Sequence, residues 1–363
     1  MKFSHFEAFA PRCPVCLRAG RQPHGLVIAH VAERTDTDVI VATLHCPDCQ
    51  HEYPVLDGIP VIVPELATLL AERGIELMLR EDLDPQLEGL LGDAIGPDSW
   101  FDAMRQVQST YGWDGYADLD PEETGRAEDP IPGSARRCLA RLLALAGPFE
   151  PTPRRMLDVG CAAGRTSFAL AQAFPQALVL GADIHLGLLR LARNAGLGRV
   201  SYPRRRIGLV YDRRRFDVAI DGADRTDFWA CDATCLPLPT GRADLCLALN
   251  LLDCVSNPRQ LLESLVQATS ENGRILLATP YDWSTRATPV TAWLGGHSQR
   301  ASHGGSGEAF LQALLAGPQG HAIPGLKILA QQSNFAWHTR LHARSAVHYQ
   351  THLVALHRQI VSA

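Results

Sequence analysis

Short apolar runs alternate with amphipathic stretches through the second half of the chain. The first run occupies residues 156–159, and four similar runs follow within residues 177–184, 225–232, 242–250 and 273–279. Each run has the length of a buried strand, and the apolar positions after the first run repeat at helical spacing. Alternating strands and helices predict an α/β fold with a parallel sheet. A last apolar stretch, residues 326–356, predicts the paired final strands of that sheet.

The residues ahead of this region have a different pattern. Residues 66–83 and 133–147 carry apolar positions at helical spacing, which predicts helices. Between them, residues 111–120 (YGWDGYADLD) are aromatic and rich in turn-forming residues, and residues 121–133 predict a mobile loop. The sequence therefore divides into three predicted parts, namely residues 1–65, a helical linker or lid at 66–150, and an α/β domain at 151–363.

Two cysteine pairs lie near the start of the chain, Cys13-Pro-Val-Cys16 and Cys46-Pro-Asp-Cys49. Two CxxC knuckles at this separation are the pattern of a zinc ribbon, and the segment between them predicts two strands around a polar turn at residues 35–38. Four thiolates leave no coordination position for water, so we expect a structural Zn²⁺. The alternatives are unpaired structural cysteines or a redox CxxC, but no thioredoxin-like βαβ pattern surrounds either pair.

Composition and charge narrow the classes of partner. The 363 residues carry a formal net charge of −5, which gives no general attraction to nucleic acid or anionic membranes. Arginine triplets at 204–206 and 213–215 could form a nucleic-acid patch, but arginine is the prevailing cation of the chain and we expect a solvated loop. No apolar run approaches the roughly 18 residues that span a bilayer, and no secretory signal is evident. We therefore expect a cytoplasmic protein with no membrane contact.

The most informative segment is a turn of small residues directly after the first strand. Residues 158–164 read DVGCAAG, and a helical pattern follows. A strand, a small-residue loop and a helix allow a ligand to approach backbone N–H groups at the start of the helix. Asp183 and Asp232 end the next two predicted strands, at the edge where ligands bind in open α/β sheets. Helix capping is the alternative role for these acids.

The D-x-G-x-A-x-G pattern resembles the first motif of class I S-adenosylmethionine (SAM) methyltransferases. That resemblance implies a Rossmann-like seven-stranded sheet in which Asp183 accepts from the ribose hydroxyls and Asp232 from the adenine amino group. It also implies that Tyr111, Trp113 and Tyr116 either close over the cofactor or pack on the domain. The cofactor-binding residues implied in this way are Asp158, Gly160, Cys161, Gly164, Asp183, Ile184, Asp232, Ala233 and Asn250.

The cysteine-rich segment has a resemblance of its own. Residues 13–65, with the ending YPVLDGIPVIVP, resemble the small zinc-ribbon proteins that partner or activate tRNA and translation-factor methyltransferases. The likeness implies that a partner protein could bind through the ribbon.

Residues 154–358 resemble a narrower family. The segments LDVGCAAGRTSFALA, NLLDCVSNPRQLL, ATPYDW and WLGG have the order and spacing of the C-terminal mercaptohistidine methyltransferase domain of ovothiol synthases. The likeness implies methylation of an imidazole nitrogen on a small-molecule acceptor. One departure is His185, two residues after the ribose acid, where that family usually carries serine. The alternatives are a SAM-dependent RNA or protein methyltransferase that docks through the ribbon, and a non-catalytic SAM-binding protein.

Under this resemblance, the loop PYDWSTRATPVTAWLGG after the fifth strand would lie over the transferable methyl group. Tyr281, Trp283 and Trp293 would form an aromatic acceptor wall, because flat rings stack on a flat acceptor and attract the sulfonium. Asp253 and Asp282 would accept a hydrogen bond from the acceptor ring. The alternative is that the two tryptophans only pack the loop.

Methylation of an imidazole acceptor does not require a strong general base. A neutral imidazole, with a pKa of about 6.5, is already a nucleophile near pH 7, so a hydrogen-bond acceptor that selects its tautomer suffices. We therefore assign no histidine of the chain a proton-transfer role. Trp337, Arg340 and Arg344 lie among the last strands and could hold a substrate carboxylate, because arginine binds carboxylates in a bidentate manner.

Overall fold

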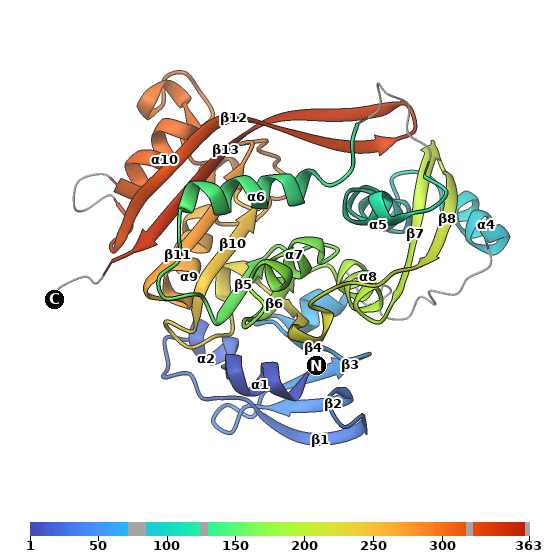
Figure 1. Cartoon of the computed structure of the whole chain (residues 1–363), viewed down its shortest axis with the longest axis horizontal. Helices are drawn as coiled ribbons and strands as arrows, with labels where there is room; N and C mark the ends of the chain where they lie inside the picture. The colour runs from blue at the N-terminus through green and yellow to red at the C-terminus, as the bar shows by residue number, and fades with distance from the viewer. Residues whose placement is uncertain (72–84, 124–129, 317–321, 360–363) are drawn as a thin grey trace.

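The computed structural model describes residues 1–71, 85–123, 130–316 and 322–359. Eleven strands form one sheet in the order β1-β2-β3-β4-β9-β6-β5-β10-β11-β13-β12, and helices pack on both its faces (Figure 1). The strands from β9 to β12 form the predicted Rossmann-like seven-stranded sheet, so the predicted α/β fold is confirmed. These strands are β5 (Arg155–Val159), β6 (Leu178–Asp183), β9 (Thr226–Cys231), β10 (Ala243–Leu249), β11 (Thr269–Thr279), β12 (Leu326–His342) and β13 (Ser345–Arg358).

The strand directions of this sheet place several strand ends together. Five adjacent strands run parallel to one another, in the order β9, β6, β5, β10 and β11. The next strand, β13, pairs antiparallel with both β11 and β12. A parallel sheet is buried on both faces, so successive side chains of a strand enter two different cores. In β5, Met156 packs on one face, whereas Leu157 and Val159 pack on the other. The carboxyl ends of β5, β6, β9 and β10 therefore lie along one edge.

The two faces are covered by different helices. Helices α6 (Ser134–Ala146), α7 (Arg165–Ala173) and α8 (Leu186–Gly196) cover one face. Helices α1 (Phe3–Phe9), α9 (Pro258–Ala268) and α10 (Gly307–Ala316) cover the other. Short 3₁₀ turns occur at Ala117–Leu119, Ala223–Arg225, Ala233–Cys235, Val290–Ala292 and Ser302–Gly305.

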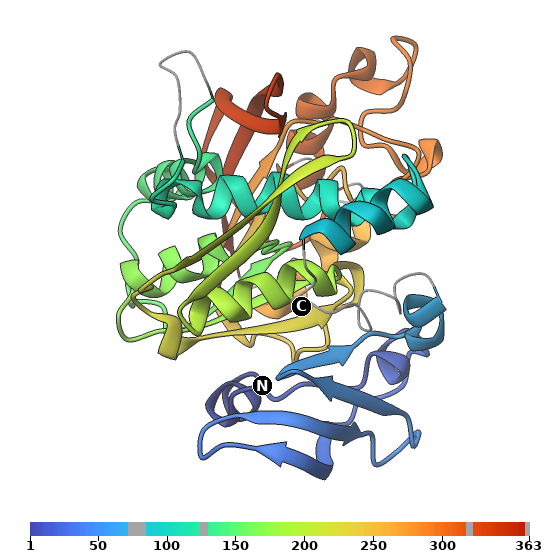
Figure 2. The same ribbon diagram turned by 90° about the vertical axis from the view of Figure 1, so that its right-hand side faces the viewer.

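The N-terminal segment extends the same sheet. It contains α2 (Pro14–Arg18), the predicted hairpin of β1 (Val27–Arg34) and β2 (Val39–His45), and then β3 (Glu52–Leu56) and β4 (Ile59–Ile62). Strand β4 pairs in parallel with β9, with Val61 opposite Ala230 and Ile62 opposite Cys231. Figure 2 shows this four-stranded unit below the central sheet. The sequence pattern predicted the hairpin but not the pairing with β9, because strand partners far apart in sequence leave no local signal.

In the part of the linker region that the structure describes, turns and irregular segments join the helices α4 (Pro85–Ile95), α5 (Trp100–Tyr116) and α6. The turn-forming residues of the aromatic segment do not interrupt the helix at its start, because Tyr111 to Tyr116 form the end of α5. Ser99 caps this helix by accepting a hydrogen bond from the Asp102 N–H. Part of the helix predicted over residues 66–83, and part of the predicted loop, lie outside the described residues.

The arginine-rich insertion is a β-hairpin rather than the solvated loop that we expected. Strands β7 (Arg199–Ile207) and β8 (Val210–Asp217) pair antiparallel. Their arginines bind acids of the linker: Arg213 lies 2.6 Å from Glu88, Arg214 lies 2.6 Å from Asp120, and Arg204 pairs with Glu123. These ion pairs neutralise much of the basic charge that could have formed a nucleic-acid patch.

None of the helices described has both the length and the apolar composition required to cross a bilayer. The predicted cytoplasmic location stays a prediction.

Candidate functional site

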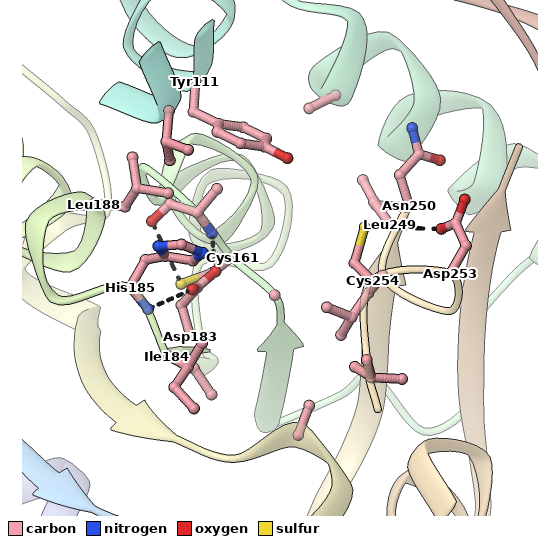
Figure 3. A pocket seen from close by; sticks show the side chains of 18 of the residues that line it. Tyr111, Cys161, Asp183, Ile184, His185, Leu188, Leu249, Asn250, Asp253 and Cys254 are labelled. Carbon is pink, nitrogen blue, oxygen red and sulfur yellow. Dashed lines mark hydrogen bonds between the residues drawn. The ribbon is translucent and has the colours of Figure 1, made fainter. Parts of the chain in front are cut away.

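A cavity of about 500 Å³ opens at the carboxyl ends of the parallel strands (Figure 3). It is lined by the loop after β5, by the ends of β6 and β9, and by the turns after β10 and β11. Helix α5 contributes Val107, Tyr111 and Asp114 to the cavity, and the β12–β13 hairpin contributes Trp337, Thr339 and Tyr349. This volume is within the range of about 300–1,000 Å³ that small-ligand sites occupy.

The small-residue loop after β5 forms the base of the cavity. Gly160 and Cys161 line it, whereas Asp158 and Gly164 do not. Gly164 has a φ of +77°, and a Cβ at this position would lie 2.6 Å from the Phe228 ring, so packing against β9 demands the glycine. Asp158 lies beneath the loop and accepts hydrogen bonds from the hydroxyls of Thr166 at 2.6 Å and Ser167 at 2.7 Å. Burial raises the pKa of Asp158 to about 6, against the opposing effect of these donors.

The Asp183 carboxylate is held rigidly at the end of β6. One oxygen accepts from the Ala162 N–H and the other from the His185 N–H, each at 2.9 Å. Each carboxylate oxygen has two acceptor positions, so both oxygens keep capacity for a ligand. Ile184 and Leu188 line the cavity beside this acid and supply apolar surface. Two fixed carboxylate oxygens beside apolar side chains fit the paired hydroxyls and the flat base of a nucleoside.

Asp232, at the end of β9, also lines the cavity, together with Ala233. One Asp232 oxygen accepts from the Thr234 N–H and hydroxyl, and the other forms an ion pair with Arg18 at 2.7 Å. Arg18 is the last residue of α2, so the N-terminal segment directly contacts this end of the cavity. Sequence reasoning missed Arg18, because 214 positions separate the two partners.

A second wall faces the Asp183 side. Figure 3 shows Asn250, Asp253 and Cys254 across the cavity from Asp183 and His185. Asp253 is 2% exposed and accepts from the Asp282 N–H at 2.6 Å, and its burial raises its pKa. Asp282 is exposed at the mouth of the cavity. We call this group of residues, together with Trp337, Tyr349 and the Tyr111 ring, whose hydroxyl points toward the gap from above Leu188 in Figure 3, the far wall.

Tyr349 completes the polar part of the far wall. Its hydroxyl donates to the Asp282 carboxylate at 2.9 Å. Tyr349 lies opposite Trp337 in the register of the β12–β13 hairpin, and both residues line the cavity, as does Tyr111 of α5. Sequence reasoning missed Tyr349. The residue stands twelve positions after Trp337 in a predicted strand pair, but only the register of the hairpin brings the two together.

The predicted aromatic wall lies elsewhere: Tyr281, Trp283 and Trp293 are outside the set of lining residues. The rings of Trp283 and Trp293 stack on each other, with centroids 6.3 Å apart. The Tyr281 hydroxyl lies 2.7 Å from Nδ1 of His352, which is buried beneath the loop. The flanking residues Pro280 and Asp282 do line the cavity. The loop therefore contributes its backbone turn and Asp282 to the cavity, while its rings face away.

The aromatic residues of α5 divide between the two roles that were left open. Tyr111 lines the cavity, whereas Trp113 and Tyr116 are buried in the core, where the Tyr116 hydroxyl donates to the Ala163 carbonyl at 2.6 Å. The arginines suggested for a substrate carboxylate do not line the cavity. Arg340 is 6% exposed and donates to the Arg205 carbonyl, and Arg344 is exposed at the hairpin turn.

The four N-terminal cysteines form one cluster. The Sγ atoms of Cys13, Cys16, Cys46 and Cys49 all lie within 4.8 Å of one another. Zinc–sulfur bonds of about 2.3 Å in a tetrahedron place sulfurs about 3.8 Å apart, so this donor set fits one metal ion with small adjustments. The four thiolates fill a tetrahedral shell, and the cluster lies apart from the cavity. These are the marks of a structural metal site, and binding would stabilise the fold of the segment directly.

Comparisons with known proteins agree with this arrangement. A family model described as "Methyltransferase domain" matches residues 133–343, which is more than half of the chain. Two trans-aconitate 2-methyltransferases of Rhodopseudomonas palustris, strains BisB5 and BisB18, are 36% and 38% identical to the chain over 77 residues. These segments span 28% of each relative and 21% of this chain.

Solved structures of low sequence identity match as well. The SAM-bound magnesium protoporphyrin IX methyltransferase of Synechocystis PCC 6803 is 17% identical and has a TM-score of 0.42, over 77% of this chain and 100% of that one. A chain from the complex of the Haloferax volcanii Trm112 methyltransferase activator with a methyltransferase is 17% identical and has a TM-score of 0.38. That match covers 62% of this chain and 89% of the other.

Proposed function

Because the chain belongs to the methyltransferase domain family and is a SAM-dependent methyltransferase, we propose that it methylates a ring nitrogen of a small imidazole or a related amino-acid-derived heterocycle. The observation that carries this proposal is the far wall. It combines flat rings, from Tyr111 and Trp337, with carboxylates that accept hydrogen bonds, from Asp253 and Asp282. A flat heterocycle with an N–H group is the kind of acceptor that needs both.

The opposite side of the cavity fits the cofactor. Asp183 would accept from the ribose hydroxyls, and Asp232, already oriented by Arg18 and Thr234, would face the adenine. Gly160, Cys161, Ile184 and Ala233 would line the remaining contacts on this side, with Asp158 and Gly164 shaping the loop from below, and Asn250 would reach the cofactor from the far wall. When bound, SAM supplies an electrophilic methyl group on a sulfonium.

The reaction needs alignment more than proton transfer. In methyl transfer from SAM, the acceptor nitrogen would bond to the methyl carbon while the electron pair of the carbon–sulfur bond stayed on sulfur. The methylated ring would then release its N–H proton to solvent. Asp253 and Asp282 would select the tautomer by accepting from the other ring nitrogen, while stacking on Trp337 and Tyr111 would fix the ring plane. The same carboxylates would stabilise the positive charge that develops on the ring.

We also propose roles for the three parts of the chain. Residues 1–65 would act as a structural zinc ribbon that supports the adenine side through Arg18, and it could bind a partner protein. Residues 66–150 would act as a lid that contributes Tyr111. Residues 151–363 would carry the methyltransferase chemistry. Nucleic acid is a poor candidate for the acceptor, because acids of the linker pair with the arginines of the β7–β8 hairpin.

A methyl-transfer assay tests the proposal. Labelled SAM is incubated with the enzyme and, separately, with histidine, histamine, a mercaptohistidine, small dipeptides and bulk tRNA. We expect label on an imidazole nitrogen, assigned by NMR of the product, and none on tRNA. Methylation of tRNA or protein with no product from the imidazole panel would refute the proposed acceptor class but not the SAM-dependent chemistry.

A further inference from the structure

We infer that the acceptor carries a protonated amine and no free carboxylate, as in a decarboxylated, histamine-type imidazole. The inference rests on the proposed imidazole acceptor and names its charge class. It starts from the charged side chains that line the cavity. Five are aspartates: Asp114, Asp183, Asp232, Asp253 and Asp282. Among the described lining residues, no lysine or arginine appears, and His185 is the single basic side chain.

Three of these acids already form hydrogen bonds or ion pairs on the cofactor or linker side. Asp114 accepts from three backbone N–H groups at the start of α6, those of Gly133, Ser134 and Ala135. Asp232 is paired with Arg18, and Asp183 is held by two backbone N–H groups. Arg18 reaches Asp232 from the N-terminal segment and does not line the cavity. The negative charge left for the acceptor is therefore that of Asp253 and Asp282.

Within the part of the chain that the structure describes, the far wall holds no cation that would receive an acceptor carboxylate. Asp282 accepts from Tyr349, a neutral donor, and Asp253 accepts from a backbone N–H. Arg340 of β12 does not line the cavity: its guanidinium donates to the Arg205 carbonyl, and the guanidinium carbon lies 5.8 Å from the centroid of the Trp113 ring. An acceptor carboxylate placed here would be an unpaired charge beside two others, which is unfavourable in a partly closed site.

A protonated amine on the acceptor would be attracted by the same two carboxylates. Asp282, at the mouth, offers its second carboxylate oxygen to an ammonium group, while the imidazole ring reaches inward between Trp337 and Tyr111. In histamine, two carbons separate the ring from the amine. This spacing would let the ring reach the buried Asp253 while the amine stays at the exposed Asp282. The same reasoning disfavours polycarboxylate acceptors of the trans-aconitate kind, even though relatives with that name share a segment of sequence.

Three substrates with one ring test the inference: histamine, histidine and 3-(imidazol-4-yl)propionate. These carry an amine alone, both groups, and a carboxylate alone. We expect kcat/KM to fall in that order, with histamine about tenfold above histidine, because complementary charge is rewarded and like charge is penalised. A preference for histidine or the propionate would overturn the inference while leaving the imidazole proposal intact.

A variant assigns the preference to one residue. Asp282→Asn should lower kcat/KM for histamine about tenfold and lower that for histidine much less, so that the two substrates converge. Asp221→Asn is the matched control, because Asp221 is exposed and does not line the cavity. An unchanged ratio in Asp282→Asn, with normal SAM affinity, would refute the role of this carboxylate.

A binding measurement separates the two hypotheses if no imidazole is methylated. Calorimetry on the enzyme saturated with S-adenosylhomocysteine compares phenethylamine with 3-phenylpropionate, which share a flat ring but not the heterocycle. Tighter binding of the amine would support the charge class even though the imidazole proposal had failed. Tighter binding of the carboxylate would overturn the inference whatever the outcome of the turnover assay.

Discussion

The two walls of the cavity are built in different ways. Most of the Asp183 wall comes from one contiguous segment, because β5, the glycine loop, α7, β6 and the start of α8 follow each other within residues 155–188, and Asp232 joins it from the end of β9. The far wall comes from α5, from the turns after β10 and β11, and from the β12–β13 hairpin, which are spread over more than two hundred residues. The comparison teaches that the side proposed for the cofactor is encoded mostly by local sequence, whereas the side proposed for the acceptor depends on the tertiary fold.

The largest expected effect is on the cofactor wall. Asp183→Ala removes the two oxygens that would bind the ribose and also releases the N–H groups of Ala162 and His185. Each charged hydrogen bond contributes about 1.5–3 kcal/mol, so we expect SAM affinity to fall about a thousandfold. Calorimetry measures the affinity, and circular dichroism checks the fold. Unchanged SAM affinity would show that Asp183 does not bind the cofactor, and it would contradict the assignment of the two walls to cofactor and acceptor.

A smaller effect should come from the acid beneath the loop. The pKa of Asp158 is raised in the folded protein, to about 6 from an ordinary value of 3.8. The protonated form is therefore favoured by folding, and the stability it contributes is complete below about pH 4 and is lost as the pH rises through about 6. A shift of about two units corresponds to about 3 kcal/mol.

Asp158→Asn should remove this dependence. Urea unfolding between pH 4 and pH 7 should show the stability of the wild type falling relative to the variant across this interval. Parallel curves would mean that Asp158 is ionised throughout, held by its bonds to Thr166 and Ser167.

The smallest expected effect distinguishes two tryptophans. Trp337 lines the cavity, whereas Trp283 stacks on Trp293 outside it. Trp337→Ala should lower kcat/KM for the acceptor about tenfold with little change in SAM affinity, since lost stacking costs about 1–1.5 kcal/mol. Trp283→Ala should lower the melting temperature, and it should leave both kcat/KM for the acceptor and the affinity for SAM near the wild-type values. The reverse outcome would restore the aromatic wall that the sequence predicted.

The sequence predicted the fold well because its signals are local. Period and run length identify β5, β6, β9, β10 and β11, and the CxxC pairs identify the cysteine cluster. The positions of Asp183 and Asp232 at strand ends could also be predicted, because each follows a short apolar strand and precedes a turn. Trp283 and Trp293 show the limit of this reasoning. Residue type indicated an aromatic wall, but the direction of a ring in irregular backbone depends on its neighbours.

Long-range partners account for most of what could not be predicted. Arg18 and Asp232, or Arg213 and Glu88, meet only because the chain folds, and neither partner carries a distinguishing pattern. Tyr281 is a related case. Its left-handed φ of 57° and its contact with His352 turn the ring away from the cavity while Asp282 faces it. Such a reversal between adjacent residues is a property of the backbone conformation, which composition does not encode.

The parallel pairing of β4 with β9 has a consequence for how the enzyme can be divided. Every residue of β9 is buried, and its sequence, TDFWAC, is rich in residues that favour strands. A shortened chain that began after the cysteine-rich segment would leave the N–H and C=O groups of this strand facing water beside apolar side chains. An unprotected edge of that kind recruits other strands. We therefore expect residues 1–65 also to protect the α/β domain against self-association, and a shortened chain without them to aggregate.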